Sequence, residues 1–467
     1  MNKGSDLGLG LGLGLLVKPN TKSKNEYTTL PMPIEQIYNV SQINNLYGFN
    51  QLPYKEVPNG PNINIVIVIA YSYPNLQNDL DKFCEINNIA SRKLNIVKLN
   101  PNTPSSDSWV TEICLDTQWL HAICPYANIT VVEANSDLVD DLIIAIQKAN
   151  SLSPKPNIIN ISWGIKEFDG CDSIDIFDPE IMYIAASGDD NYVAWPSSNP
   201  NILSVSATTL ITNSAGTEFI GQTTWSSSGC GPSKYFKIPD YQKNNVKKIN
   251  SNYRLTSDVC IDGNPKTGLY IYSEGSYFGI GGTSVSAPLI CGTMAIIFYQ
   301  RLLKNLPLYN SNQNDKLGIQ NIIYNIYGKN LNNIYNKLFY DVTQGLSGNY
   351  SASLGYDYPT GLGTPYVPNF VPYLINNNGI LPTLKVDILS SSEVKYKNKD
   401  NSTGTATSLI SVSATSNDLS EKDILEQKLI VQLEQSIIPH HFSTLIDKEK
   451  IEKYDFNHYH STSFDFI

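Results

Sequence analysis

Charged residues are scarce in this sequence, and several other common features are missing. They make up 16% of the 467 residues, against about a quarter in a typical globular protein. The net charge is −10 with no block of Lys or Arg, which argues against a nucleic-acid partner. The seven cysteines occur singly, without a C-x-x-C pair, which argues against a disulfide framework and a zinc site. No apolar run is long enough to span a bilayer.

The chain divides by composition into three parts. Residues 1–30 read as a disordered extension whose Leu-Gly repeats, interrupted by Asp6, make a poor signal peptide. Residues 31–375 carry the globular pattern. Residues 376–467 are predicted to form a flexible linker and a C-terminal tail with one amphipathic helix over about 420–437. The histidines of that tail read either as a metal site or as solvated side chains.

The globular part alternates between strand-like and helix-like segments. Apolar runs predict strands at residues 63–70, 93–99, 129–133, 158–162 and 181–186. Helical patterns lie between them, at 78–88, 105–122 and 137–149. This alternation predicts an α/β fold with a doubly wound, mostly parallel sheet and helices on both faces. Ligands and catalysis then belong at the carboxyl ends of the strands.

The stretch Gly281-Gly282-Thr283-Ser284 stands between a strand pattern and an all-apolar helix pattern. Ser284 is therefore expected at the positive end of a buried helix, a place that suits a nucleophile or an anion. Pro288 has no N–H, so it leaves the Ser284 carbonyl without its usual helical partner. Taken alone, the stretch also fits a plain helix cap.

Histidine is too scarce to serve as the base for Ser284. His121 is the only histidine before residue 440, and Asp116 precedes it by five residues on a predicted helix. At about 100° per residue the two side chains point about 140° apart, so they do not pair. Glu112 and Asp116, four residues apart, share a face of that helix. They read either as a solvated acidic face or as a buried pair that shares a proton and supplies a base.

A third acidic residue follows a predicted buried strand. In Ala185-Ala186-Ser187-Gly188-Asp189-Asp190, Asp189 would lie in the cleft at the strand end. A protonated Asp there could donate a hydrogen bond to a developing oxyanion. The same string also fits an ordinary Gly-Asp turn.

These motifs, in this order, resemble the sedolisins, the serine-carboxyl peptidases related to subtilisin. The match consists of Glu112-x-x-x-Asp116, Ser187-Gly188-Asp189 and Gly282-Thr283-Ser284-x-x-x-Pro288, with similar flanking stretches at 160–164, 254–259 and 264–268. The resemblance covers about residues 30–375 and implies a subtilisin-like fold. It implies Ser284 as nucleophile, Glu112 as base and acid, Asp116 as the group orienting Glu112, and Asp189 as oxyanion donor.

The resemblance also implies one structural Ca²⁺ ion near the end of the globular part. Its ligands would be the carboxylates of Asp341 and Asp357 and the backbone carbonyls of Val342, Ser353 and Gly355. Such an all-oxygen set on turning backbone suits calcium. The family usually has glycine where Ser353 stands, a tolerable change because only the carbonyl would bind.

The sequence also departs from the family pattern. Family members are usually made with a long inhibitory propeptide, and about 30 residues before the domain are too few for one. The stretch 167–189 is short, so the substrate-site helix of the family looks trimmed, and Asp190-Asn191 replaces the usual small residues after the oxyanion Asp. The C-terminal tail resembles no part of the family.

We therefore expect an endopeptidase that hydrolyses peptide bonds at acid pH through an acyl-enzyme on Ser284. Its partners would be polypeptide substrates, and it would be a monomer. The chemistry suggests an acidic or extracellular compartment, and the poor signal peptide leaves the cytoplasm open. The alternative is a catalytically weak or silent sedolisin-like binding module. A nucleotide-binding α/β protein is disfavoured, because no Gly-rich loop follows the first strand.

Overall fold

The computed structural model describes residues 30, 32–330 and 333–377, together with the backbone of five strands between residues 385 and 464. The chain forms two compact units, 1–379 and 380–467. The first contains all the candidate catalytic and metal-binding residues.

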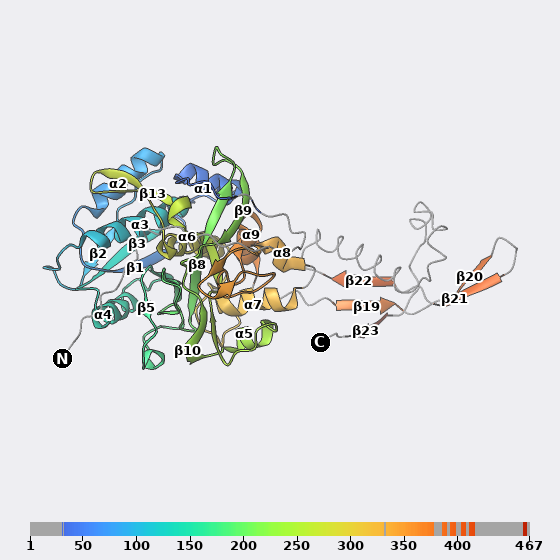
Figure 1. Ribbon diagram of the computed structural model, residues 1–467. Coiled ribbons are helices and arrows are strands. Elements are labelled where there is room, and N and C mark those ends of the chain that lie inside the picture. The colour runs from blue at the N-terminus through green and yellow to red at the C-terminus, as the bar shows by residue number, and fades with distance from the viewer. Residues whose placement is uncertain are drawn as a thin grey trace. The chain divides into compact units, whose positions relative to one another are not determined.

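A parallel sheet forms the centre of the first unit (Figure 1). Its strand order is β12-β8-β6-β4-β1-β3-β2, and every pair along this path is parallel. An eighth strand, β9 (Phe219–Thr224), pairs antiparallel with β8. The seven parallel strands are β1 (Asn64–Ala70), β2 (Asn95–Lys98), β3 (Asn128–Ala134), β4 (Ile158–Ile161), β6 (Met182–Ala186), β8 (Ile202–Thr212) and β12 (Val259–Asp262).

The central strands are buried on both faces because their side chains are apolar at successive positions. All residues of β4, β6 and β8 are buried, as are six of the seven in β1. Such continuous burial requires helices on both faces of a parallel sheet. By contrast β2, at the end of the strand order, is mostly exposed.

The helices cover both faces of this sheet. Helix α6 packs against α3 and crosses β4, β6, β8 and β12, whereas α4 packs against β1 and β3. This is the α/β architecture that the sequence predicts. The helices are α1 (Val40–Leu46), α2 (Leu76–Asn87), α3 (Asp107–Ile123), α4 (Val139–Asn150), α5 (Asp240–Asn245), α6 (Thr283–Leu303), α7 (Ile319–Lys329), α8 (Ile334–Leu338) and α9 (Val367–Asn376).

Helix α6 is the core helix of this unit. Its residues from Thr283 to Arg301 are all buried, because they are apolar or small on every side. By length and composition alone this helix could cross a membrane, but 89% of its most apolar window is buried inside the protein. Its apolar character is therefore explained by its place in the core.

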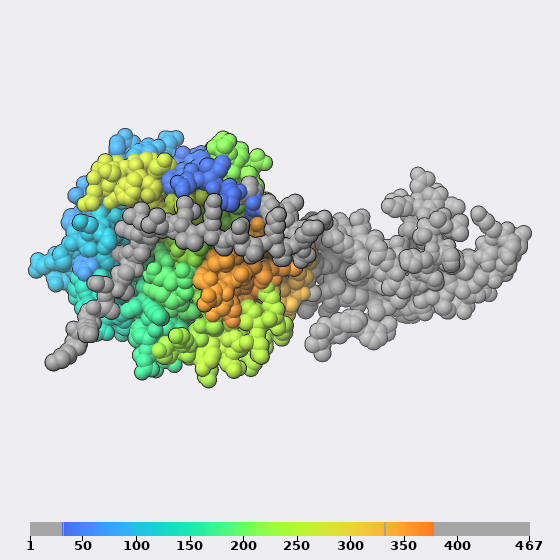
Figure 2. Space-filling model, viewed as in Figure 1, coloured from blue at the N-terminus to red at the C-terminus, as the bar shows by residue number. Residues whose placement is uncertain are grey.

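A hairpin leads the chain into α6. It consists of β13 (Leu269–Ser273) and β14 (Ser276–Ile280), and its first strand is tied to α3 where Trp119 Nε1 donates to the Tyr270 carbonyl at 2.9 Å. The N-terminal segment runs beside it, since Tyr38 forms a parallel bridge with Leu269. Figure 2 shows this blue segment next to the yellow hairpin. The hairpin thus fixes where the helix begins.

Shorter elements complete the first unit. Three 3₁₀ helices occur, η1 (Phe49–Gln51), η2 (Cys171–Ser173) and η3 (Pro265–Thr267). The remaining strands are β5 (Ile165–Lys166), β7 (Ala194–Trp195), β10 (Gly231–Lys237), β11 (Tyr253–Thr256), β15 (Phe339–Tyr340), β16 (Leu346–Ser347), β17 (Tyr350–Ser351) and β18 (Thr364–Pro365).

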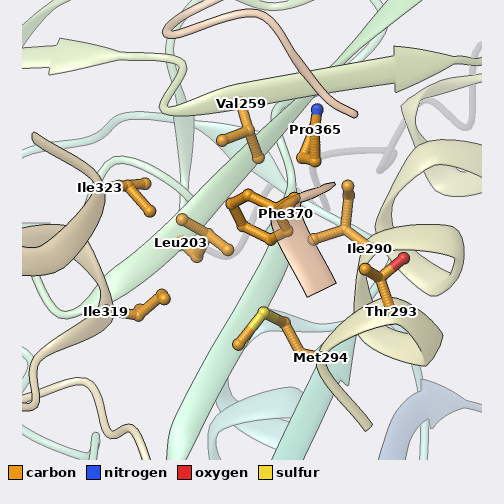
Figure 3. Close-up of a pocket in the computed structure, with 9 residues that line it drawn as sticks. All are labelled: Leu203, Val259, Ile290, Thr293, Met294, Ile319, Ile323, Pro365 and Phe370. Atoms are coloured by element: carbon orange, nitrogen blue, oxygen red, sulfur yellow. The ribbon is translucent and has the colours of Figure 1, made fainter. Parts of the chain in front are cut away.

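A small apolar cavity lies between α6, α7, α9 and the strands β8 and β12 (Figure 3). Phe370, Leu203 and Met294 point into it, and the only polar lining side chain is Thr293, whose hydroxyl donates to the Leu289 carbonyl at 2.8 Å. Such a cavity has no polar partner for a ligand, so it is a local packing defect of the core.

The second unit contains short antiparallel pairings. Strand β19 (Lys385–Leu389) pairs with β22 (Ser411–Thr415) and β23 (Ser461–Phe464), and β20 (Glu393–Lys397) pairs with β21 (Thr403–Thr407). The helix that the sequence predicts over 420–437 and the tail histidines lie outside the described residues.

Candidate active site

Two glycines bring Ser284 to the start of α6. Gly282 has φ of 126°, and a Cβ on it would lie 2.7 Å from Oδ2 of Asp189. A Cβ on Gly281 would lie 2.3 Å from the backbone N of Pro265. Only glycine satisfies both conditions. Ser284 follows as the second residue of the helix, 8% exposed, where the unpaired N–H groups of the first turn favour negative charge.

The Ser284 hydroxyl faces the end of β4. It donates to the backbone carbonyl of Ser162 at 3.0 Å. It also lies close enough to Glu112 that its hydrogen bonding lowers the pKa of that carboxyl. The serine thus stands between a carbonyl and a carboxyl, each able to accept its proton.

Glu112 and Asp116 are buried, so they do not form a solvated acidic face. Glu112 is 6% exposed and Asp116 is fully buried, because α3 packs its carboxyl-bearing face toward α6. Glu112 Oε1 and Asp116 Oδ2 are buried without a hydrogen-bond partner among the described residues. Two such carboxyls cannot both ionise at low cost, so they are suited to share one proton.

Burial dominates the acidity of this pair. It raises the pKa of Glu112 well above its ordinary value, the charge of Asp116 raises it further, and Asp189 adds a smaller effect of the same sign. Burial raises the pKa of Asp116 to about 7, against the lowering effect of hydrogen bonds from Ser162 and Asn160. A carboxyl pair with raised pKa values, next to a serine hydroxyl, can work as a general base and acid.

Asp189 lies on the other side of the helix start. Its Oδ1 accepts from the backbone N–H of Thr283 at 2.8 Å and from the Thr283 hydroxyl at 2.7 Å. Burial raises its pKa despite these two bonds. Because Oδ1 is occupied, Oδ2 beside Gly282 is the oxygen left to carry a proton and donate it to a ligand.

His121 takes no part in this cluster. Its Nε2 lies 2.8 Å from the Ala90 carbonyl, and burial lowers its pKa. Asp116 instead accepts from Ser162 Oγ at 2.5 Å. The sequence argument against a histidine triad therefore agrees with the placement of both residues.

Two supporting residues could not be assigned from the sequence. Ser162 contacts both Asp116 and Ser284, and Thr283 holds Asp189. Both occur in the motifs singled out above, yet nothing in their spacing indicates these partners. The contacts depend on how β4 and α6 pack, which single-residue patterns do not report.

The predicted calcium ligands lie together on one turning stretch after β15. Asp341 Oδ2 accepts from the Gly355 N–H at 2.7 Å, and Asp357 Oδ2 accepts from the Ser353 N–H at 2.8 Å. Asp341 Oδ1 is buried without a partner, and burial raises the pKa of Asp357 to about 7. Two buried carboxyls with an unsatisfied oxygen fit a hard cation such as Ca²⁺.

A serine at the start of a buried helix, beside a buried carboxyl pair and at the carboxyl edge of a doubly wound sheet, defines the class as subtilisin-like. The family model described as the subtilase family matches residues 98–332, about half of the chain. The chain therefore belongs to the subtilase family.

Its relatives are sedolisins. It is 32% identical over 200 residues to sedolisin from Pseudomonas sp. (strain 101) and 26% identical over 302 residues to kumamolisin from Bacillus sp. (strain MN-32). These alignments cover 40% and 57% of this chain. The resemblance to sedolisins drawn from the sequence is thereby confirmed. The chain spans 31% of the first relative's length and 50% of the second's.

The fold is that of a solved sedolisin. The structure of Pseudomonas sedolisin, described as a serine-carboxyl proteinase complexed with two molecules of pseudo-iodotyrostatin, aligns with a TM-score of 0.59 at 23% identity. The alignment covers 74% of this chain and 99% of that one. The subtilisin-like architecture predicted from the sequence is confirmed.

Proposed function

We propose that the protein is a serine-carboxyl endopeptidase that hydrolyses peptide bonds at acid pH. One observation carries the proposal: the buried Glu112–Asp116 pair, with one unpartnered oxygen on each carboxyl, lies beside the Ser284 hydroxyl. The substrates would be polypeptides, as the serine-carboxyl proteinase described for the Pseudomonas relative suggests. We expect the enzyme to act as a monomer.

Acylation begins when the Ser284 hydroxyl turns from the Ser162 carbonyl to Glu112. Glu112 takes the proton as Ser284 Oγ forms a bond to the scissile carbonyl carbon, and the carbonyl electrons move to the oxygen. Asp116, which carries the shared proton, donates to Glu112 and keeps it ionised until this step. Glu112 then gives the proton to the leaving amine as the C–N bond breaks.

Asp189 would stabilise the oxyanion. Protonated at Oδ2, it donates to the developing negative charge while Thr283 holds Oδ1 in place. Water then enters, Glu112 takes its proton, and the acyl-enzyme is hydrolysed by the reverse sequence. No other residue is needed for proton balance.

The raised pKa values predict a bell-shaped dependence of kcat/KM on pH. At the acid limb a second proton on the Glu112–Asp116 pair removes the base. At the basic limb Asp189 loses its donor proton, and the Asp116 proton, with a pKa of about 7, is lost as well. Activity therefore lies on the acid side of neutrality.

The test compares Ser284→Ala and Glu112→Gln with wild type on a peptide substrate at about pH 3–5, where a Glu base titrates. Both variants should lose activity, whereas Asp107→Asn, an exposed carboxyl at the start of the same helix, should not. A peptide aldehyde should form an adduct with Ser284 at acid pH.

One feature favours the silent binding module as the second candidate. Between β5 and β6 the only regular element among the described residues is the 3₁₀ helix η2, so little structure walls this side of the cleft. A wild-type chain that neither cleaves peptides nor reacts with the aldehyde would support that reading.

We also propose that one Ca²⁺ ion binds at Asp341, Val342, Ser353, Gly355 and Asp357. Carboxylates and carbonyls supply the oxygen ligands that calcium prefers, and the buried oxygen of Asp341 lacks any other partner among the described residues. The bound ion would neutralise these buried charges and hold the loop. It has no part in the acyl transfer.

A further inference from the structure

Ser162 contacts two catalytic residues through different atoms. Its hydroxyl donates to Asp116 Oδ1 at 2.5 Å, and its backbone carbonyl accepts from the Ser284 hydroxyl at 3.0 Å. Ser162 is 2% exposed and ends the buried strand β4, so both contacts are held by the sheet. Asn160, two residues earlier on the same face, donates from Nδ2 to Ser162 Oγ at 2.9 Å.

The direction of these bonds determines where the shared proton lies. Ser162 has one hydroxyl proton, and because Asn160 donates to its oxygen, that proton is free to point at Asp116. Asp116 Oδ1 is then an acceptor, so the proton of the carboxyl pair belongs on Oδ2, which has no other partner. A carboxyl protonated on Oδ2 is a donor, and the ionised Glu112 is its acceptor.

We propose that Ser162, supported by Asn160, is a positioning residue that keeps the shared proton on Asp116 Oδ2 and so keeps Glu112 ionised as the base. The inference rests on the proposed function and adds a residue to it. The other groups facing Asp116 are Glu112 on α3 and the Cys291 thiol on α6, and burial raises the pKa of that thiol. The hydroxyl of Ser162 is therefore the neutral donor that orients the carboxyl.

The main test is Ser162→Ala. Without the hydroxyl, Asp116 can carry its proton on either oxygen, and Glu112 loses part of its donor. The Glu112 pKa should rise, moving the acid limb of kcat/KM to higher pH. We expect kcat to fall about 10- to 100-fold, a typical loss for a supporting hydrogen bond, with KM unchanged. Ser162→Thr should restore the profile.

Ser204→Ala is the matched control. Ser204 is a fully buried serine on β8 whose hydroxyl has no partner in the described part of the chain. Its loss should leave kcat and the pH profile unchanged. An equal effect in both variants would assign the Ser162 effect to general packing and overturn the proposal.

A double-mutant comparison separates positioning from a structural role. If Ser162 acts through Asp116, Ser162→Ala adds no further loss of kcat in an Asp116→Ala background. Losses that multiply would overturn the proposal. An unshifted acid limb in Ser162→Ala would do the same.

A second measurement does not need activity. In a Ser284→Ala background, Ser162→Ala removes a bond that lowers the pKa of Asp116. The free energy of unfolding should then fall more steeply between about pH 5 and pH 8 than with Ser162 present. This slope can be measured even if the wild type is inactive, so failure of the proposed function and failure of this inference are distinguishable.

Discussion

At the scale of single residues, Gly282 links the nucleophile to the oxyanion site. Gly282→Ala would place a methyl group 2.7 Å from Asp189 Oδ2, at a φ of 126°. Asp189 must then move away from the position where it donates to the oxyanion. We expect kcat/KM to fall by about 10²- to 10³-fold, as for loss of an oxyanion donor.

The control for this change is Gly275→Ala. Gly275 has a similarly left-handed φ of 82°, but a Cβ there meets nothing within 4 Å. It therefore tests the backbone cost alone. Peptidase assays and thermal melts on both variants separate the contact from the strain. Equal losses of activity in the two variants would argue against a role for the Asp189 contact.

Residue spacing was enough to select Glu112, Asp116, Asp189 and Ser284. The i, i+4 spacing of the two carboxyls on one helix and the glycines before the serine have direct physical meanings. Whether the carboxyls were buried could not be read from the sequence, because burial depends on α3 packing against α6. For the same reason the contacts of Ser162, far away in the sequence, needed the structure.

At the scale of elements, Arg301 joins the core helix α6 to α9. Fully buried, it donates from Nη1 to the carbonyls of Leu374 at 2.8 Å and Asn377 at 2.6 Å, and from Nε to that of Pro307 at 2.7 Å. The C-terminal end of α9 is thereby capped by a cation, which its dipole favours.

Arg301→Met should destabilise the protein by about 3 kcal/mol, because several buried carbonyls lose their donor at once. Lys304→Met is the comparison, since Lys304 contacts Asn376 Oδ1 at 2.6 Å from an exposed position. Its loss should cost below about 1 kcal/mol. Urea denaturation measures both. Similar costs for the two variants would mean that the buried cap contributes little.

The calcium loop offers a second prediction at this scale. Lys248 Nζ contacts the Leu354 carbonyl at 2.5 Å and Ser353 Oγ at 3.0 Å, within the loop that carries the proposed ligands. Its charge also lowers the pKa of both Asp341 and Asp357. An ammonium group so close to the loop repels a divalent cation.

Lys248→Met should therefore raise the calcium affinity several-fold, and Asp357→Asn should lower it strongly. Calorimetric titration of the metal-free protein with CaCl₂ measures both, and a chelator should lower the Tm of the wild type. Lys243→Met, an exposed lysine on α5, serves as the control. An affinity that is the same with and without Lys248 would contradict the electrostatic argument.

Element boundaries followed the sequence best where one pattern dominated. The apolar run at 63–70 became β1, and the predicted helix 105–122 became α3. Residues 205–272 gave only a mixture of strand and turn signals, because their strands are short and pair with distant partners such as β8 with β12. Their arrangement depends on tertiary pairing that local patterns do not encode.

At the scale of the whole molecule, buried carboxyls link stability to pH. Burial raises the pKa of Glu112, Asp116, Asp189 and Asp262. Each such group binds its proton more tightly in the folded chain than in the unfolded chain, where a carboxyl titrates near about 4. The folded state therefore holds more protons above this pH, and the free energy of unfolding falls as pH rises.

Asp262 tests this linkage away from the catalytic residues. It is fully buried, its Oδ1 accepts from the Thr267 hydroxyl at 2.8 Å, and its Oδ2 has no partner among the described residues. Asp262→Asn replaces a group that must stay protonated with one that is neutral at every pH. Denaturation curves at several pH values between about 4 and 7, in a Ser284→Ala background that prevents self-cleavage, give the slope. The variant should lose up to about 1.4 kcal/mol of pH dependence per pH unit, while Asp240→Asn, an exposed carboxyl on α5, should leave the slope unchanged. If the slope of Asp262→Asn equals that of the parent, Asp262 is ionised in the folded protein, and its burial must be compensated by another group.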